Sequence, residues 1–311
     1  MKKAIILQHG GGELANQLWN HISIYAYCVE KNIKCENYSF FEYAYFFAIS
    51  PINNKILYFL FFSPFHNHIS RRNSFRTNFF RTFYKVYILF IRLTKHHSII
   101  SSINSDNKPF YLPPTLSEEH FLATEKNNGV LYFEGWLFRN PEGIKKYRDE
   151  IVRCFLPRKS IQHLVKSAIA PLRRRFTHIV GIHFRQGDYA TFKKGQHFLN
   201  ASRVCEALKD YLKQNNKRAT KTAFVVTSDS NINISDFPGL NIFPARGNAV
   251  EDLFTLSTTD IIIGSDSSFG NLAAYFGNIP HIVITKGPID WAYYQGKTGY
   301  FPTKYCTMVH Y

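Results

Sequence analysis

The stretch Ile179–Tyr189, IVGIHFRQGDY, decides how the second half of this chain folds. It begins with an apolar run rich in β-branched residues, which predicts a buried strand. The strand ends in a turn that carries the imidazole of His183, the guanidinium of Arg185 and the carboxylate of Asp188. Open α/β sheets bind ligands at the carboxyl ends of their strands, so this turn is a candidate site. A surface ion pair and a core histidine would also explain these residues one by one.

Downstream of this stretch, two kinds of apolar segment alternate. Short β-rich segments predict strands, and longer segments with three- and four-residue apolar spacing predict helices. Their alternation indicates βαβ units, a parallel sheet and a Rossmann-like domain. The expected strands are 179–184, 223–227, 240–243, 261–264 and 281–285, and the expected helices are 201–214, 250–257 and 267–276.

Two further polar loops are expected at the same sheet edge. Asp229 follows the strand 223–227, and the segment GSDSSFGN, which includes Asp266, Ser267 and Ser268, precedes and opens the helix 267–276. The free N–H groups in the first turn of a helix favour a bound phosphate. Helix capping explains Asp266 and the serines equally well.

A glycine-rich turn occupies the start of the chain. Ala4–Leu7 is expected to be a strand, followed by His9–Gln17, HGGGELANQ, and a helix with apolar spacing. Such a turn can bring backbone N–H groups to an anion. Gly10–Ala15 also fits the loose G-x-G-x-x-A dinucleotide fingerprint, with Glu36 near the place of its ribose-binding acid. A lipase-like oxyanion turn is disfavoured because the chain contains no G-x-S-x-G elbow.

The region from Tyr43 to Ser105 contains no acidic residue and is rich in aromatic residues and cations. Segment 55–97 could lie on an anionic membrane surface, with bases against phosphate and aromatics at the headgroups. An ordinary helical subdomain with a basic outer face is the favoured hypothesis, and the membrane surface comes second. Nucleic-acid binding is less favoured because no known binding module is present. The cations are Lys55, Arg71, Arg72, Arg76, Arg81, Lys85, Arg92 and Lys95.

Composition sets the outer limits of the function. The 311 residues carry a formal charge of +16 and a pI of about 9.6, so we expect an anionic partner. The five cysteines form no C-x-x-C pair, and the first apolar run is too short for a signal peptide, so we expect a cytoplasmic protein without structural zinc. Pro157 ends a helical segment, so we expect domains of 1–157 and 158–311 with a helical aromatic and basic insertion at about 43–105.

Three motifs, in order along the chain, resemble those of the GDP-fucose-dependent fucosyltransferase superfamily, which includes α1,2-, α1,6- and protein O-fucosyltransferases. Gly12–Gln17, GELANQ, is similar to the G-x-x-N-Q turn with one extra residue. His183–Tyr189, HFRQGDY, resembles the H-x-R-R-G-D-Y motif, and Gly264–Ala274 resembles the G-x-S-S-F segment before the last helix. The three motifs span most of the chain, although the region 43–128 matches none.

The resemblance implies a GT-B fold, in which two Rossmann-like domains face a cleft and the second holds most of the donor nucleotide. It implies an inverting, metal-independent transfer of fucose from GDP-fucose to a glycan hydroxyl, with an α1,2 linkage favoured. The acceptor could be a lipid-linked or cell-surface precursor met at the inner face of a membrane. Without a metal, a guanidinium and helix N–H groups must stabilise the charge that grows on the leaving GDP.

The same resemblance suggests roles for individual residues. Arg185 would contact the β-phosphate, and Asn16 would reach the donor sugar or phosphate. The catalytic base stays open among Glu13, Asp188 and Asp266. The residues expected to bind the nucleotide are Gly12, His183, Arg185, Asp229, Asp266, Ser267, Ser268 and Phe269.

Gln186 is a departure from the family pattern, because it replaces the second arginine of H-x-R-R and removes a positive charge. Arg246 is a candidate substitute, or simply a surface cation. Two other function classes stay open. An NAD-linked Rossmann oxidoreductase would use the first glycine turn and give Arg185 no role, and a nucleic-acid-binding protein would rest on charge alone.

Overall fold

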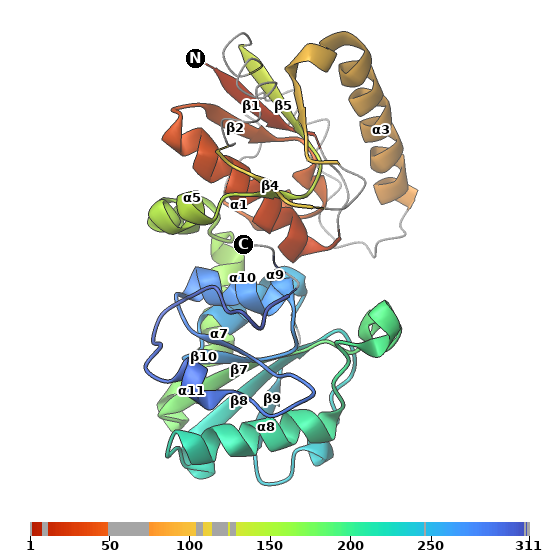
Figure 1. Ribbon diagram of the computed structural model, residues 1–311. Helices are drawn as coiled ribbons and strands as arrows, with labels where there is room; N and C mark the ends of the chain where they lie inside the picture. Colours follow the sequence, from red (N-terminus) through yellow and green to blue (C-terminus); the bar gives the residue numbers. More distant parts are fainter. Residues whose placement is uncertain are drawn as a thin grey trace. The chain divides into compact units, whose positions relative to one another are not determined.

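The computed structural model describes residues 2–7, 12–48, 75–103, 108–113, 124, 129–245, 247–307 and 309 (Figure 1). Within them, nothing is described of the side chains of residues 41, 75–80, 188, 192 and 193. The expectations for His9–Gly11, for the basic segment up to residue 74 and for Arg246 lie outside the described residues. The chain divides into two compact units between Arg158 and Lys159.

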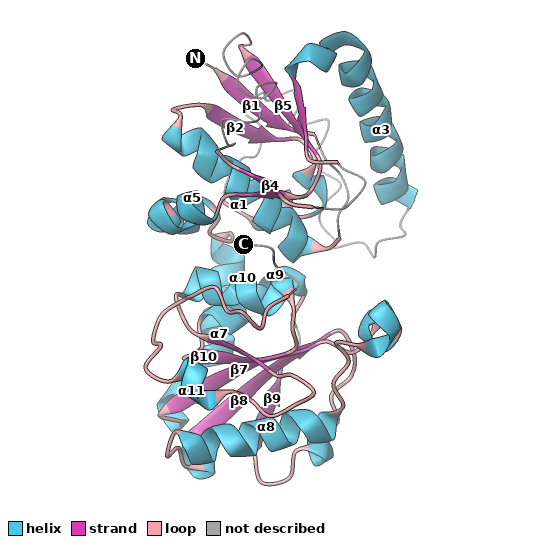
Figure 2. Ribbon diagram, in the orientation of Figure 1, coloured by secondary structure: helices cyan, strands magenta, loops and turns pink. Residues whose placement is uncertain are grey.

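The N-terminal unit contains a four-stranded parallel sheet (Figure 2). Its order is β2-β1-β5-β3, and a separate short pair joins β4 and β6. The expected strand at the start of the chain therefore lies inside a parallel sheet, as in a Rossmann-like unit. The strands are β1 (Lys3–Ile6), β2 (Lys34–Asn37), β3 (Ile99–Ser101), β4 (Phe110–Tyr111), β5 (Val130–Glu134) and β6 (Phe138–Arg139).

The helix after the glycine turn, α1 (Leu14–Glu30), connects β1 to β2. Its predicted apolar positions Leu18 and Ile22 are fully buried. Trp19 and Tyr27 are buried as well, and the ring of Tyr27 packs against that of Phe133 in β5, with 6.0 Å between the ring centroids. The other helices of this unit are η1 (Phe40–Glu42), η2 (Ala44–Phe46), α3 (Phe75–Lys95), η3 (His96–Ser98), α5 (Pro141–Lys146) and α6 (Arg148–Cys154).

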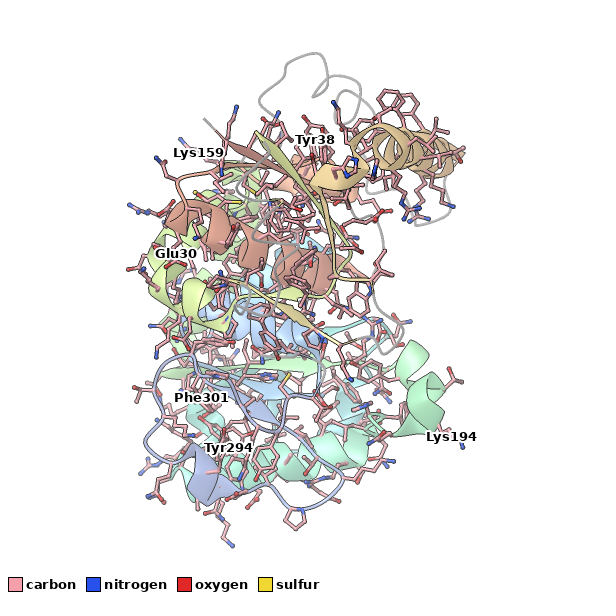
Figure 3. The ribbon with its side chains drawn as sticks, turned by 45° about the horizontal axis from the view of Figure 1, so that its top comes forward. Glu30, Tyr38, Lys159, Lys194, Tyr294 and Phe301 are labelled. Atoms are coloured by element: carbon pink, nitrogen blue, oxygen red, sulfur yellow. The ribbon has the colours of Figure 1, made fainter. Side chains whose placement is uncertain are left out.

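Helix α3 lies beside the N-terminal sheet and is held at the carboxyl ends of its strands (Figure 1). The hydroxyl of the fully buried Tyr84 donates a hydrogen bond to the carbonyl of Leu7, just after β1. A guanidinium N–H of Arg92 reaches the carboxylate of Glu134, the last residue of β5, at 2.7 Å. The ring of Tyr87 lies 5.9 Å from that of Tyr38, one of the residues labelled in Figure 3. One side of α3 is therefore firmly attached to the unit.

The C-terminal unit contains the predicted five-stranded parallel sheet, in the order β11-β10-β7-β8-β9. The sequence prediction of this sheet is confirmed, with strand ends shifted by no more than two residues. Its strands are β7 (His178–Phe184), β8 (Thr222–Ser228), β9 (Asn241–Pro244), β10 (Ile261–Gly264) and β11 (His281–Val283). Its helices are α7 (Lys159–Arg175), α8 (Ala201–Gln214), α9 (Ala249–Ser257), α10 (Ser268–Gly277) and α11 (Trp291–Tyr294), with short turns η4 (Asp188–Ala190), η5 (Phe192–Gly195), η6 (Ala219–Lys221) and η7 (Ile234–Asp236).

Alternate residues of the central strand β7 face opposite helix layers. Val180 and Ile182 pack with α8, whereas Ile179 packs with α7. Complete burial of each such side chain contributes about 1.5 to 3 kcal/mol. At Gly181 a Cβ atom would lie 2.8 Å from the hydroxyl of Thr259, so glycine is needed for the close approach of the segment after α9.

Candidate active site

Two of the predicted polar loops meet at the carboxyl edge of the C-terminal sheet, because β10, β7 and β8 are neighbours and run in parallel. Arg185 follows β7, and its backbone N–H donates to the hydroxyl of Ser265, just after β10, at 3.2 Å. Nε of Arg185 lies 3.2 Å from Oδ2 of Asp229, just after β8. The structure therefore brings Arg185 and Asp229 together.

Asp229 holds the turn that carries the arginine. Its Oδ1 accepts hydrogen bonds from the backbone N–H groups of Gln186 at 2.8 Å and Gly187 at 3.1 Å. A Cβ atom at position 187 would lie 2.7 Å from Oδ2 of Asp229, so glycine allows this close contact. The side chains of Arg185 and Asp229 are 26% and 28% exposed, so the ion pair is partly removed from water. The carboxylate of Asp229 thus fixes the turn, and its contact with a nucleotide stays a prediction.

The ring of Tyr189 supports the same guanidinium from another side. The centre of the Arg185 guanidinium lies 5.6 Å from the centroid of this ring. The Tyr189 hydroxyl donates to the carbonyl of Asp266 at 2.9 Å, which ties the β7 loop to the start of α10. The arginine is therefore held by a carboxylate, by a ring and through its own backbone.

His183 lies beneath this surface and is only 5% exposed. Its ring stacks on Phe269 at 4.8 Å, and its Nδ1 lies 3.4 Å from the hydroxyl of Thr227. Burial, together with the charge of Arg185 and the neighbouring His281, lowers the pKa of His183 to about 3. The ring is therefore neutral at physiological pH. Its Nε2 has no hydrogen-bond partner among the described residues.

Helix α10 begins at this edge, one residue later than a cap at Asp266 would place it. The cap is Ser267, whose hydroxyl accepts from the N–H of Phe269 at 3.1 Å. The carboxylate of Asp266 instead accepts from the backbone N–H of Thr307 at 3.2 Å and from its hydroxyl, and lies 3.4 Å from Nδ1 of His197. Sequence reasoning could not foresee this, because Thr307 is 41 residues away in the chain.

Gln186 closes the loop after β7 and does not replace the missing arginine. Its amide donates to the carbonyl of Leu199 at 2.8 Å and to that of Arg185 at 3.2 Å. The backbone of Asp188 begins the short helix η4, but its side chain is not described. Arg246, the proposed substitute cation, lies outside the described residues.

The glycine turn of the N-terminal unit places three further candidates. Gly12 has φ +107°, and a Cβ atom there would lie 2.6 Å from Nδ2 of Asn16, so the amide of Asn16 lies against the glycine. Gln17 donates to the carbonyl of Gly12 at 3.3 Å. The exposed carboxylate of Glu13 accepts from the Tyr43 hydroxyl at 3.0 Å. Burial and the charge of Glu13 raise the pKa of Tyr43, so its phenol stays protonated and remains a donor.

Glu36 does not suit the role of a ribose-binding acid. It is 2% exposed and forms ion pairs with Lys3 at 2.6 Å and Lys34 at 3.3 Å, and it accepts from the hydroxyl of Tyr38 at 2.8 Å. Burial alone would raise its pKa, but hydrogen bonds from Lys3 and Tyr38 hold that pKa below its ordinary value. The carboxylate is therefore committed to its own sheet, which removes the main support for a dinucleotide site.

A cavity of about 240 Å³ between α7 and α9 is a feature that sequence reasoning missed. Its walls are mostly apolar side chains such as Leu172, Val225 and Phe243, and two acids, Glu251 and Asp252, also line it. Oδ1 of Asp252 is buried and has no hydrogen-bond partner among the described residues. Burial raises the pKa of this carboxyl to about 6, against a hydrogen bond from the N–H of Gly247. The only available signal was an acid in the first turn of a predicted helix, which capping already explains.

In the part of the chain that the structure describes, no three histidine, cysteine, aspartate or glutamate side chains lie together in a way that could hold a metal ion. Besides the carboxylates of Asp229 and Asp266, which pair with neighbouring protein groups, the β7, β8 and β10 edge carries a guanidinium, hydroxyls and the N–H groups of α10. Such groups bind anions, and phosphate in particular.

Comparisons with known proteins agree with this chemistry. The family model described as Glycosyl transferase family 11 matches residues 111–290, a segment that contains the β7, β8 and β10 loops and Asp252 but not the glycine turn. A search of curated protein sequences finds no similar sequence.

Solved fucosyltransferase structures share the fold. A point mutant of Arabidopsis thaliana FUT1, solved with GDP, is 12% identical, with a TM-score of 0.53 over 92% of this chain and 71% of that one. NodZ from Bradyrhizobium is 14% identical, with a TM-score of 0.52 over 93% and 97% of the two chains. POFUT1 in complex with GDP-fucose is 10% identical, with a TM-score of 0.51 over 93% and 96%. As the resemblance of the three motifs predicted, the chain shares its fold with solved fucosyltransferases, and the family match shows that it belongs to glycosyl transferase family 11.

Proposed function

We propose that this enzyme transfers fucose from GDP-fucose to a hydroxyl group of a glycan. The observation that carries the proposal is the guanidinium of Arg185, which is fixed by Asp229 beside the N-terminus of α10. A fixed cation beside the N–H groups of a helix N-terminus suits a nucleoside diphosphate, and this edge offers both. GDP and GDP-fucose bound to FUT1 and POFUT1, which share the fold, support the choice of nucleotide.

In the proposed reaction, the bond between C1 of fucose and the β-phosphate oxygen breaks as the acceptor hydroxyl forms a new bond to C1. The electron pair of the broken bond leaves with GDP, and Arg185 together with the N–H groups at Ser267 and Ser268 would stabilise that charge. Attack from the face opposite GDP inverts the configuration, so a β-linked donor would give an α-linked product. We favour the α1,2 linkage from the motif resemblance and propose that no metal is required.

We also propose that the cavity at Asp252 receives the guanine base. The Watson–Crick edge of guanine carries two adjacent N–H donors, from N1 and the amino group, and a carboxylate is the acceptor that matches both. The apolar walls formed by residues such as Val225 and Phe243 suit the faces of a flat ring. Oδ1 of Asp252, which is buried without a hydrogen-bond partner among the described residues, would accept a hydrogen bond when guanine binds.

A catalytic base must take the proton of the glycan hydroxyl, and we propose Glu13 and Asp188 as the candidates. Glu13 is exposed, and its carboxylate is oriented by the hydroxyl of Tyr43, which supports a role in taking the proton. We propose that Asn16, against the glycine turn, contacts the donor sugar or a phosphate. The variants Glu13→Gln and Asp188→Asn test the choice. Only substitution of the residue that takes the proton should abolish the fall in kcat at low pH.

A cytoplasmic location is part of the proposal, and five free cysteines support it. The decisive experiment is calorimetric titration of the full chain with GDP, GDP-fucose, UDP and NAD, with and without EDTA. We expect binding of GDP and GDP-fucose only, unchanged by EDTA. Binding of NAD or UDP in their place would contradict the donor, and loss of GDP binding or of fucose transfer in EDTA would contradict the metal-independent mechanism.

A further inference from the structure

Helix α3 has an exposed apolar face that the proposed reaction does not use. Tyr84 and Ile91 are buried on its inner side, where Arg81 also reaches the carboxylate of Glu42 with Nε at 3.1 Å. In the described part of the chain, five large apolar side chains of the same helix are 46% to 73% exposed. They are Phe83, Val86, Leu89, Phe90 and Leu93.

These side chains form one continuous stripe. At 3.6 residues per turn they cover an arc of about 120° on the side of the helix away from Tyr84 and Ile91. Positions 83, 86, 90 and 93 have the alternating three- and four-residue spacing of a contact face. Half of the exposed large hydrophobic residues in the described chain therefore lie on one helix and on one side of it. A contiguous patch of this kind marks an interaction site.

The charges beside the stripe indicate what covers it. The sequence of α3, FRTNFFRTFYKVYILFIRLTK, contains no acidic residue, and the exposed Lys85 lies at the edge of the stripe, about 40° around the helix from Leu89, whereas the exposed Lys95 lies on the Tyr84 side. Arg92 contacts Glu134 but remains 51% exposed. A second copy of this helix would bring cations against cations, without an acid on either helix to pair with them. An anionic surface with an apolar layer beneath it matches both the stripe and its cations.

We propose that the outer face of α3 binds the surface of an anionic lipid bilayer, with Phe83, Phe90 and Leu93 entering the headgroup region and Lys85, which borders the stripe, against the phosphates. The helix would lie in the plane of the membrane. None of the described helices is long and apolar enough to cross a bilayer. Because Tyr84 and Arg92 tie α3 to the carboxyl ends of β1 and β5, this contact would hold the glycine-turn edge of the N-terminal unit close to lipid-linked acceptors.

Flotation of the full chain with phosphatidylcholine vesicles, with and without phosphatidylglycerol, tests the proposal. We expect binding to the anionic vesicles only, weakened by salt. Phe90→Ser with Leu93→Ser should lower the partition coefficient at least about tenfold. The matched control, Ile103→Ser with Ile234→Ser, changes two side chains of similar exposure elsewhere and should bind like the wild type. Near-UV circular dichroism confirms that each variant is folded.

Neutralisation of the cations gives an independent measurement. Lys85→Gln should weaken binding to anionic vesicles by about fivefold. Lys95→Gln, on the Tyr84 side of the helix, should weaken it less. Three results would overturn the proposal: no flotation of the wild type, equal binding to neutral vesicles, or equal binding of the Phe90 and Leu93 variant. If the wild type does not bind vesicles but forms a dimer, and the Phe90 and Leu93 variant is a monomer, the stripe belongs to an interface with a second copy. DNA binding without vesicle binding would assign the cations to nucleic acid.

Discussion

Replacement of Asp252 by asparagine should raise the stability of the enzyme and weaken its nucleotide binding. Burial raises the pKa of this carboxyl from 3.8 to about 6, and the charge of Glu251 adds to the rise, while the N–H of Gly247 opposes it. Between these pH values the folded chain keeps a proton that the unfolded chain has released. The free energy of unfolding must therefore fall as the pH rises through this window. Above pH 6 the buried carboxylate lowers stability by about 3 kcal/mol.

Asparagine has nearly the same shape and no charge. We expect Asp252→Asn to raise the free energy of unfolding at pH 8 by up to about 3 kcal/mol and to leave it almost unchanged at about pH 4. Guanidinium chloride unfolding at both pH values measures this. Hydrogen bonds to a charged group contribute about 1.5 to 3 kcal/mol, so the same variant should bind GDP about 10- to 100-fold more weakly. In the wild type, GDP affinity should fall as the pH drops below about 6.

The control is Asp236→Asn, which removes an exposed carboxylate of the same unit and should change neither quantity. A variant that is more stable at pH 8 but binds GDP as tightly as the wild type would refute the assignment of guanine to this cavity. A variant with no gain in stability at pH 8 would refute the buried, ionised carboxylate itself. The two conclusions can therefore fail separately.

Two further substitutions test the arginine and the glycine turn. Arg185→Lys keeps the charge but loses the planar contact of Nε with Asp229, and we expect kcat to fall about 100-fold; Arg173→Lys, in an ion pair outside the proposed site, should leave kcat unchanged. Gly12→Ala forces a side chain into φ +107° and against Asn16, and should cost about 1 to 3 kcal/mol in unfolding free energy together with most of the activity. Gly239→Ala, at φ +82° with no atom within 4 Å of the added Cβ, should lose stability but keep activity, and equal activity losses would contradict a role for the turn.

The sheet of the C-terminal unit could be predicted because its signal is local. Each β-rich segment is short and bounded by turns, and each following helix has its own apolar spacing, so order and direction follow from the alternation. Helix α7 was missed: its last turns contain Pro171, which sequence patterns take as a helix breaker. The helix nevertheless continues to Arg175, and its buried side, with Ile161, Val165 and Ile169, packs in the unit.

The candidate site was predictable only where contacts follow from strand order. Arg185 and Asp229 follow adjacent parallel strands, so their proximity was implied once the sheet was assigned. The contact between Asp266 and Thr307 could not be predicted, because Thr307 is 41 residues away and no local sequence pattern indicates that the two meet. Asp252 could not be predicted for another reason. What distinguishes it is that its Oδ1 is buried without a hydrogen-bond partner among the described residues, and this arises only when α9 packs against its neighbours.

The side chains of the motif HFRQGDY mostly serve to hold one guanidinium. His183 is buried and neutral beneath Phe269, and Gln186 closes the loop onto a backbone carbonyl. Gly187 leaves room for the Asp229 carboxylate, and Tyr189 joins the loop to α10 while its ring lies beside Arg185.

These contacts explain why the loop tolerates glutamine where the H-x-R-R-G-D-Y motif has a second arginine. The contacts that orient Arg185 come from Asp229, Ser265 and Tyr189, and none of them needs a cation at position 186. The substitution removes a charge from the diphosphate side, so Gln186→Arg should tighten GDP binding if its side chain turns toward the nucleotide. It should also loosen the loop, because the hydrogen bond to Leu199 would be lost. A variant with tighter GDP binding but lower kcat would show that the loop contact matters more to this enzyme than the charge.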